Sequence, residues 1–185
     1  MNTTEIECRF LEIDKDALIK KLVELGVHDE GEELIEETVI YDKKLKWRDE
    51  QKFVRLRKIG DKIKLTYKEH SKHTVDGTYE LEFGIDDYAK AEVLFEKIGL
   101  RPFRHQQKKR HTFKLDGVSV DIDSWPMIPT FVELEGDSEQ ALKDAAQKLG
   151  LDWGKADFHN ARWVIENVYK IPVGTFQWYT FARCE

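Results

Sequence analysis

Hydrophobic and polar residues alternate with the two-residue period of a β-strand along much of the chain. In residues 4–10 one face carries Ile6, Cys8 and Phe10, and the opposite face carries Glu5, Glu7 and Arg9. Strand character returns at residues 32–42, 52–59, 62–68, 78–83, 104–114, 118–123 and 131–135. Two Gly/Asp pairs, at residues 60–61 and 116–117, are typical of hairpin turns. The pattern therefore predicts eight strands and at least two hairpins.

Four stretches carry apolar residues at helical spacing, over residues 14–25, 86–98, 138–149 and 158–169. Helix-start or N-cap candidates are Asp14 and Asp16 for the first helix, Asp86 and Asp87 for the second and Ser138 for the third, and a glycine follows each of these helices. A stripe of this kind is more often the side that packs on a sheet than a cofactor site. We expect residues 43–50 to be a charged connection, and residues 172–185 to be an aromatic tail that adds a strand or covers an apolar surface.

Composition bounds the class of protein. The chain has 185 residues, of which 41% are apolar, enough for the core of one domain, expected over residues 1–171 with the tail of 172–185 outside it. A net charge of −6 argues against a nucleic-acid partner. The sequence has no long apolar run, so we expect neither a membrane span nor a signal peptide. Cys8 and Cys184 make no disulfide framework, so we expect a reduced, cytoplasmic protein.

Charged residues make up 36% of the chain, and along the strands they are sorted by sign. The acidic pairs are Glu5/Glu7, Glu80/Glu82, Asp121/Asp123 and Glu133/Glu135. The basic pairs are Arg55/Arg57, Lys64/Lys68 and Lys108/Arg110. A solvated sheet face usually mixes signs, because like charges opposite one another destabilise it. The sorting favours a sheet closed into a barrel with a charged lumen and an apolar outer face covered by helices.

Like charges enclosed in a lumen need compensation. Divalent cations would neutralise the carboxylates, and a polyanion would neutralise the Arg and Lys side chains. A metal-bound polyphosphate meets both needs, and no Gly-rich phosphate loop offers another cradle. The alternative is a charged sheet face without a ligand.

Other candidate groups have simpler interpretations. His70 and His73 lack further ligands nearby in sequence and fit a polar loop over residues 70–76. Trp47, Tyr67 or Trp125 could stack on a base, although such aromatics more often belong to a core or a surface. Arg162 or Lys170 could add a basic group near a tunnel mouth, although each is more often a solvated charge.

Taken together and in order, these motifs resemble the CYTH superfamily of triphosphate tunnel metalloenzymes over nearly the whole chain. The signature E-x-E-x-K corresponds to residues 5–9, and R-x-R corresponds to Arg55-Leu56-Arg57. The Leu-Thr-x-Lys strand, the second E-x-E and the basic strand correspond to residues 65–68, 80–82 and 108–110. The closing motifs are Asp121-Ile122-Asp123 and Val132-Glu133-Leu134-Glu135.

The resemblance implies an α+β fold, with an eight-stranded antiparallel tunnel and flanking helices. It implies Mg²⁺ or Mn²⁺ bound by Glu5, Glu7, Glu133 and Glu135 with Asp121 or Asp123. It implies a triphosphate bound by Arg55, Arg57, Lys68 and Arg110, together with Lys64 and Lys108. Glu80 and Glu82 would orient these bases or take part in metal binding.

One position departs from the family pattern. The signature lysine is Arg9 here, which keeps the charge but cannot act as a titratable amine. We place Arg9, Lys68 and Arg110 in catalysis, with Arg9 as a phosphate-binding group.

Three functions fit these residues. The first is a metal-dependent hydrolase of tripolyphosphate, a nucleoside triphosphate or thiamine triphosphate. The second is a class IV adenylyl cyclase, which converts ATP to cyclic AMP and pyrophosphate. The third is a polyphosphate- or nucleotide-binding module without turnover. The expected partner is a small molecule that contains a triphosphate, and a homodimer is expected from the resemblance, with the aromatic tail as its candidate contact.

Overall fold

The computed structural model describes residues 3–70 and 78–185, and the side chains of residues 6–69 and 79–185. Most of the predicted loop at residues 70–76, including His73, lies outside this range, as do the side chains of Glu5 and His70.

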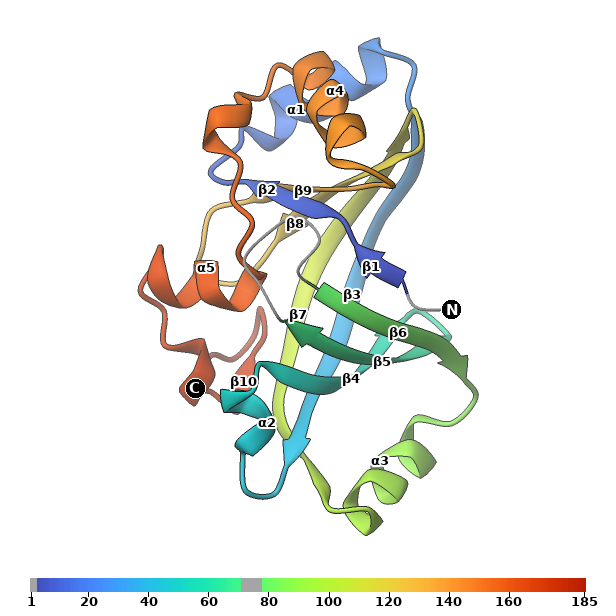
Figure 1. Ribbon diagram of the computed structural model, residues 1–185, viewed down its shortest axis with the longest axis vertical. Helices are drawn as coiled ribbons and strands as arrows, with labels where there is room; N and C mark the ends of the chain where they lie inside the picture. Colours follow the sequence, from blue (N-terminus) through green and yellow to red (C-terminus); the bar gives the residue numbers. More distant parts are fainter. Residues whose placement is uncertain (1–2, 71–77) are drawn as a thin grey trace.

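One curled sheet organises the described chain (Figure 1). Its antiparallel path runs β1-β6-β5-β4-β3-β7-β8-β9-β2, and β10 pairs in parallel with β7. The strands are β1 (Thr3–Glu5), β2 (Glu7–Phe10), β3 (His28–Asp42), β4 (Lys52–Ile59), β5 (Lys62–His70), β6 (Thr78–Ile85), β7 (Leu100–Leu115), β8 (Val118–Ser124), β9 (Phe131–Glu135) and β10 (Trp178–Tyr179).

The sheet closes through its first strand segment. β1 pairs with β6 at one end of the path and β2 pairs with β9 at the other, with Ile6 alone between them. Residues 4–10 were predicted to form one unbroken strand, and this is wrong. The segment is divided at Ile6 because its first half pairs with β6 and its second half pairs with β9. Counted as one segment, β1 and β2 complete eight antiparallel segments within the described chain, so the predicted tunnel fold is confirmed.

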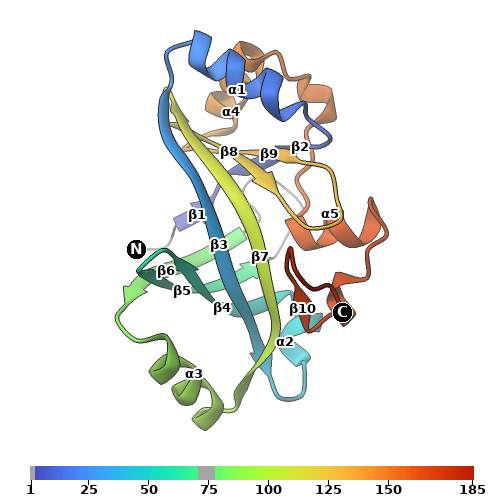
Figure 2. The same ribbon diagram turned by 180° about the vertical axis from the view of Figure 1, so that it is seen from behind.

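The turns follow their sequence signals. Asp116 and Gly117 have φ angles of 51° and 85° between β7 and β8, as a type I′ hairpin requires at both central positions. Two strands begin earlier than predicted, because β3 and β7 pair along nearly their whole length, from His28 opposite Lys114 to Asp42 opposite Leu100. This long ribbon is the spine of the molecule (Figures 1 and 2).

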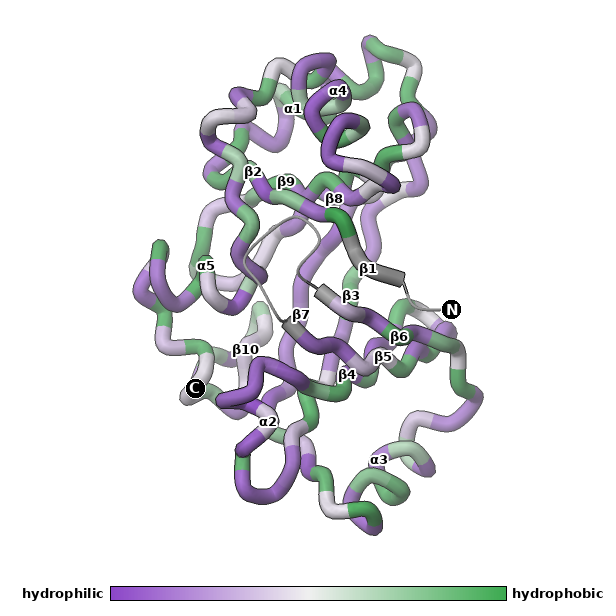
Figure 3. Tube along the Cα trace, viewed as in Figure 1, coloured by the Kyte–Doolittle hydropathy of each residue, from purple (hydrophilic) through white to green (hydrophobic). Residues whose placement is uncertain are grey.

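The apolar faces of the strands turn outward, under the helices. α1 (Lys15–Glu24) and α4 (Glu139–Leu149) cover β2, β8 and β9, and α3 (Tyr88–Lys97) covers a second cluster near β4 and β5. The N-caps Asp14, Asp87 and Ser138 are as predicted. Leu134 is fully buried, and burial of such a side chain contributes about 2 kcal/mol. Hydrophilic and hydrophobic residues follow one another along these strands in Figure 3, so the opposite, inward face is polar.

Two predicted segments are corrected. Residues 43–50 contain a short helix, α2 (Lys46–Asp49). The helix predicted over residues 158–169 is shorter, α5 (Ala161–Asn167), because the Asn160 side chain caps its start. Single-turn helices occur at Trp153–Lys155 and Val173–Thr175.

The C-terminal tail does both things considered for it. It adds β10 beside β7, and Tyr179 is fully buried against Trp125, Ile165 and Val173. Tyr179 is thus part of the core of this chain and unavailable to a partner. Among the described residues, no helix is both long and apolar enough to cross a bilayer.

Candidate active site

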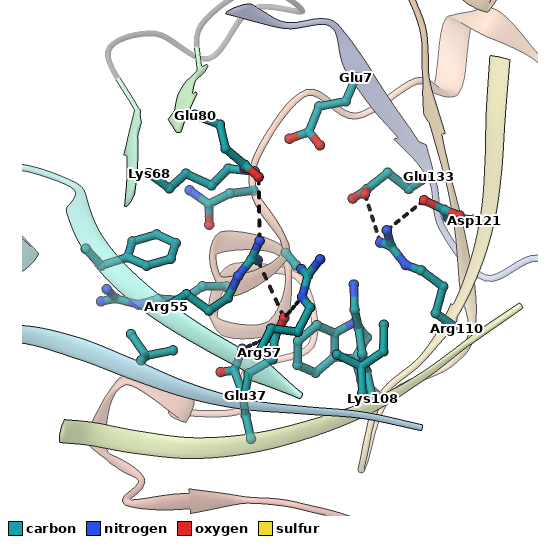
Figure 4. A pocket seen from close by; sticks show the side chains of 18 of the residues that line it. Glu7, Glu37, Arg55, Arg57, Lys68, Glu80, Lys108, Arg110, Asp121 and Glu133 are labelled. Atoms are coloured by element: carbon teal, nitrogen blue, oxygen red, sulfur yellow. Dashed lines mark hydrogen bonds and ion pairs between the residues drawn. The ribbon is translucent and has the colours of Figure 1, made fainter. Parts of the chain in front are cut away.

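A cavity of about 580 Å³ occupies the inside of the curled sheet, and we call it the central cavity. Strands from β2 to β9 line it, together with residues of α2 and α5. Among the described lining residues, acidic and basic side chains occur in equal numbers. Opposite charges are also close to one another within the cavity. Carboxylates gather around Arg110 on one side, and arginines gather around Glu37 on the other (Figure 4).

Three carboxylates converge on the side formed by β8 and β9. Asp121, Glu133 and Glu135 each offer an oxygen atom, and these oxygens all lie within 4.8 Å of one another. We call these residues the carboxylate cluster. The register produces it, because Asp121 pairs directly with Glu133 across the two strands and Glu135 is two residues further on the same face.

β2 adds two charged residues beside the cluster. Glu7 pairs across the strands with Glu135, and Arg9 pairs with Glu133. The Arg9 guanidinium donates to Oε1 of Glu7 at 3.0 Å, forms an ion pair with Glu133, and donates to the carbonyl of His159 at 2.7 Å. Arg9 is 3% exposed, so these contacts are what make its burial tolerable.

Arg110 of β7 binds the other side of the cluster. Its Nη1 lies 2.6 Å from Asp121, its Nη2 lies 2.9 Å from Glu133, and its Nε lies 2.6 Å from Asp123. Nη2 donates to Asp123 as well, at 2.7 Å. Four hydrogen bonds to carboxylates use most of the five guanidinium N–H groups. Arg110 therefore holds the acidic residues in position.

The charges of the cluster are unevenly compensated. Burial would raise the pKa of Glu133, but Arg9 and Arg110 outweigh it and hold that pKa well below its ordinary value. Burial raises the pKa of Glu135, and the nearby charges of Glu133 and Glu7 raise it further. Negative charge is therefore in excess around Glu135.

The basic side chains of β4 and β5 face the cluster from across the cavity. They are Arg55, Arg57, Lys64 and Lys68. Lys68 Nζ lies 3.0 Å from Glu80, and Lys64 Nζ lies 2.6 Å from Glu82. Glu80 and Glu82 thus stand among the bases, on β6, and not beside the carboxylate cluster.

Glu37 of β3 anchors this wall and was missed by the sequence analysis. Its Oε1 lies 2.8 Å from Arg57 Nε and 3.6 Å from Arg55 Nη1, and Gln106 donates to its Oε2 at 2.6 Å. Burial would raise its pKa, but Arg55 and Arg57 outweigh burial and lower it. The alternation along β3 gave no signal, because apolar Ile35 and Val39 share this inward face with Glu37.

Lys108 lies between the two walls. Its Nζ lies 2.8 Å from Asp123 and stands over the ring of Trp125. Burial and the neighbouring charge of Arg110 lower its pKa.

Arginines at the α5 end of the cavity were partly missed. Arg162 lines the cavity, as was considered for it, and so do Arg48 and Arg104. Arg104 has the same strand parity as Lys108 and Arg110, so extending the alternation along β7 would have found it. Lys170 is exposed.

Of the three aromatics considered for base stacking, two belong to the core. Trp47 and Tyr67 pack edge to face, with ring centroids 6.0 Å apart, in the cluster beneath α3. Trp125 lines the central cavity.

The structure thus brings the predicted residues other than Glu5 and Asp123 into the lining of one cavity, with one correction to the sorting by sign. Arg9 and Arg110 stand among the acids, and Glu80 and Glu82 stand among the bases, because cross-strand partners neutralise one another. Asp123 forms ion pairs with Lys108 and Arg110. Glu5 lies in β1, and its side chain is outside the described part.

The donor set of the carboxylate cluster suits a hard divalent cation. Carboxylate oxygens are the ligands that Mg²⁺ and Mn²⁺ prefer, and here three of them converge where negative charge is in excess. Glu7 lies next to this group across β2 and β9.

Comparisons with known proteins agree with this fold. The CYTH domain family matches residues 3–155. A solved Pyrococcus horikoshii protein has 26% identity and a TM-score of 0.70, over 84% of this chain and 96% of that one. A Vibrio parahaemolyticus protein, proposed to be an adenylate cyclase, has 15% identity and a TM-score of 0.74, over 90% and 99%. A Hippeastrum protein with a dominant triphosphatase activity has 14% identity and a TM-score of 0.64, over 89% and 96%. A comparison with curated protein sequences finds no match.

Proposed function

The chain belongs to the CYTH domain family, and from this membership we propose that it is a divalent-metal-dependent phosphohydrolase of triphosphate substrates. The observation that carries the proposal is the pairing of two groups in one cavity. Asp121, Glu133 and Glu135 converge on one side, and Arg55 and Arg57 face them from the other. A cation and a phosphate chain bound there would lie side by side.

Asp121, Glu133 and Glu135, with Glu7, would hold Mg²⁺ or Mn²⁺. When bound, the ion would neutralise charge on phosphate oxygens during transfer to water. Arg9 and Arg110 fix the carboxylates through hydrogen bonds of 2.6 to 3.0 Å. We assign both arginines to positioning these carboxylates.

The bases across the cavity would bind the phosphates. Arg55 stands among three carboxylates, 3.6 Å from Glu37, 3.8 Å from Glu80 and 3.9 Å from Glu82, which place its guanidinium at the cavity. Arg57 and Lys68 have shorter contacts with carboxylates, which orient them. A phosphate chain offers charge-assisted hydrogen bonds to this whole set. Lys64 and Lys108 would extend the set along β5 and β7.

Two competing functions, an adenylyl cyclase and a binding module without turnover, are weighed against this proposal. An adenylyl cyclase needs an apolar slot for the base, and at the α5 end of the cavity the apolar side chains of Trp163 and Ile165 share the lining with three arginines. A binding module without turnover needs no metal, whereas the carboxylate cluster suits one. These features favour hydrolysis.

The deciding experiment incubates the purified protein with Mg²⁺ or Mn²⁺ and, in turn, tripolyphosphate, ATP and thiamine triphosphate. Metal-dependent release of orthophosphate supports the proposal. Cyclic AMP from ATP would instead assign a cyclase, and tight binding without any product would assign a module. The Arg101→Gln variant is a matched control, since Arg101 is exposed on β7 outside the cavity.

We also propose that the protein works in a reducing compartment. Cys8 and Cys184 are both free and lie in different core clusters, so no disulfide joins them. Two unpaired thiols are usual in the cytoplasm, which is where we place the protein.

A further inference from the structure

Three arginines meet at the α5 end of the central cavity, and we call them the arginine cluster: Arg48 from α2, Arg104 from β7 and Arg162 from α5. The helices α2 and α5 lie on the same side of the molecule, beside β10 (Figures 1 and 2). A Cβ added to Gly174 would collide with Oε1 of Glu166 and would lie 2.7 Å from Nη2 of Arg48 and 3.3 Å from Nη2 of Arg162. The absence of a side chain at Gly174 thus lets the guanidinium groups of Arg48 and Arg162 gather there with the single carboxylate of Glu166.

Arg104 is the least compensated of the three. It is 4% exposed, and its hydrogen bonds go to the carbonyl of Val173 at 3.0 Å and to the amide oxygen of Gln106 at 2.8 Å. Among the residues that the structure describes, none offers it a carboxylate within 4 Å. Burial, together with the charge of Arg162, lowers the pKa of Arg104 to about 10. A buried guanidinium with only neutral acceptors is costly unless an anion joins it.

Few carboxylates stand at this end. Glu166 lies 3.1 Å from Nε of Arg162, and its other oxygen accepts from the backbone N–H of Gly174 at 2.7 Å. Asp49 lines the cavity but is exposed. Arg48 has Phe103 beneath its guanidinium and no ion pair with a described residue within 4 Å. Positive charge is therefore in excess here, whereas negative charge is in excess at Glu135.

Trp125 supplies a second, independent observation. It lines the cavity, is 7% exposed, and packs in the same cluster as Val173, whose carbonyl accepts from Arg104. Its indole N–H is buried and has no hydrogen-bond partner in the described part of the chain. Its ring already contacts Tyr179 and Lys108. An unused donor that lines the same cavity as three arginines with a single nearby ion pair points to an acceptor-rich ligand.

The cluster stands beyond the bases assigned to the triphosphate. Arg104 precedes Lys108 by four residues and Arg110 by six on the same face of β7, which at about 3.3 Å per residue corresponds to about 13 and about 20 Å. We propose that Arg48, Arg104 and Arg162, with the indole N–H of Trp125, form a second phosphate subsite, for the further phosphates of a linear inorganic polyphosphate longer than tripolyphosphate. This deepens the proposed function and rests on it.

The chemistry favours this occupant over a nucleoside or a thiamine group. Every phosphate of a linear polyphosphate carries negative charge. The additional phosphates of a longer chain would therefore bring negative charge to the arginine cluster. A nucleoside is neutral and would leave the guanidinium groups buried without an anion. The thiazolium of thiamine is cationic and would be repelled.

The test compares chain lengths in the full-length protein. Binding of tripolyphosphate, tetrapolyphosphate and pentapolyphosphate is measured by calorimetry in the presence of EDTA. The variants are Arg104→Gln, the double variant Arg48→Gln/Arg162→Gln, and Trp125→Phe, with Arg101→Gln as the control. Thermal unfolding of each variant checks its fold. The double variant alters two half-buried side chains, so the test survives if Arg104→Gln fails to fold.

We expect the wild type to bind pentapolyphosphate about tenfold more tightly than tripolyphosphate, and the double variant to lose most of that difference. Trp125→Phe should lose part of it, and Arg101→Gln none. Equal losses for short and long chains, or a wild type without any preference for length, would overturn the subsite alone. A wild type that binds no polyphosphate in EDTA would overturn the subsite, and the proposed function falls with it only if metal-dependent release of orthophosphate is absent as well.

Discussion

The guanidinium of Arg9 donates to Oε1 of Glu7 at 3.0 Å, two residues away on the same strand, and also forms an ion pair with Glu133 on β9. A permanent positive charge thus stands between two buried carboxylates, which would otherwise repel one another. The third contact of Arg9, to the carbonyl of His159, ties this charge to the segment that leads into α5. Arg9 therefore links the acidic side of the cavity to the C-terminal part of the chain.

Arg9→Gln should destabilise the protein strongly. The change leaves Glu7 and Glu133 buried with less compensation, and breaking a buried ion pair costs about 3 to 5 kcal/mol. Arg9→Lys keeps the charge but not the planar fork, so we expect a smaller loss of about 1 kcal/mol. Urea denaturation at neutral pH without metal measures both. The exposed pair of Arg183 with Glu185 gives the control Arg183→Gln, and an Arg9→Gln loss no larger than the control's would contradict the role of Arg9.

Replacing Glu135 or Glu133 by glutamine should change the stability of the metal-free protein in different ways. Glu135 has no ion pair with a described residue and lies among like charges, so Glu135→Gln should leave metal-free stability unchanged or raise it by up to about 1 kcal/mol. Glu133 binds both Arg9 and Arg110, so Glu133→Gln should cost about 3 kcal/mol. Denaturation without metal distinguishes them.

Both variants should weaken metal binding by about tenfold or more, which a Mn²⁺ titration followed by electron paramagnetic resonance would measure. Glu36→Gln, at an exposed glutamate of β3, is the matched control. Equal stability losses in the two variants would argue against excess negative charge at Glu135, and unchanged Mn²⁺ affinity would remove both residues from the metal site.

Glu37→Gln tests the other wall through its pH dependence. Arg55 and Arg57 lower the pKa of Glu37 in the folded protein despite its burial, so this carboxylate stabilises the fold above its unfolded pKa of about 4.3. That stabilisation is lost as the pH falls through the folded value. At neutral pH the variant should be less stable by about 3 kcal/mol, because Arg55 and Arg57 both lose the charge of their most buried carboxylate partner.

The difference between the wild type and Glu37→Gln should shrink as the pH falls below about 4. Denaturation curves of both proteins across the acid range measure it. A difference that stays constant with pH would show that the carboxylate charge is not what holds Arg55 and Arg57.

The two cysteines should differ in reactivity. Burial raises the pKa of the Cys8 thiol to about 12 and removes it from solvent. Cys184 is half-buried near the C-terminus and donates to the carbonyl of Thr180. Iodoacetamide at pH 8 should therefore label Cys184 alone in the folded protein and both residues in urea, as peptide mass spectrometry would show. Labelling of folded Cys8 at the rate of Cys184 would mean that β2 opens readily.

The helices and turns could be predicted because their signals are local. Asp14, Asp87 and Ser138 cap the helices that they were expected to cap, and Asp116-Gly117 forms the expected hairpin. The parity of each strand likewise identified its inward side chains, since a strand has only two faces. Lys108 and Arg110 were assigned to the cavity on this basis, and they line it.

The homodimer stays a prediction, and two aromatics of the tail considered for its contact are engaged within this chain, whereas Phe181 is exposed. Tyr179 is fully buried, and Trp178 stacks on His105 with ring centroids 4.5 Å apart. The sequence could show that the tail is aromatic, but which surface it covers depends on where β7 passes.

The order of residues along each strand was enough to identify the inward side chains and to show that their charges need compensation. Which of these charges meet depends on the folded arrangement of the strands. Register and closure bring Glu80 to Lys68, Arg9 to Glu133, and Arg104 to Arg162 and Arg48, because cross-strand and helix-to-strand neighbours are far apart in the chain. Coulomb interactions depend on those distances, so the signs along each strand could not reveal that each wall carries its own counter-charges.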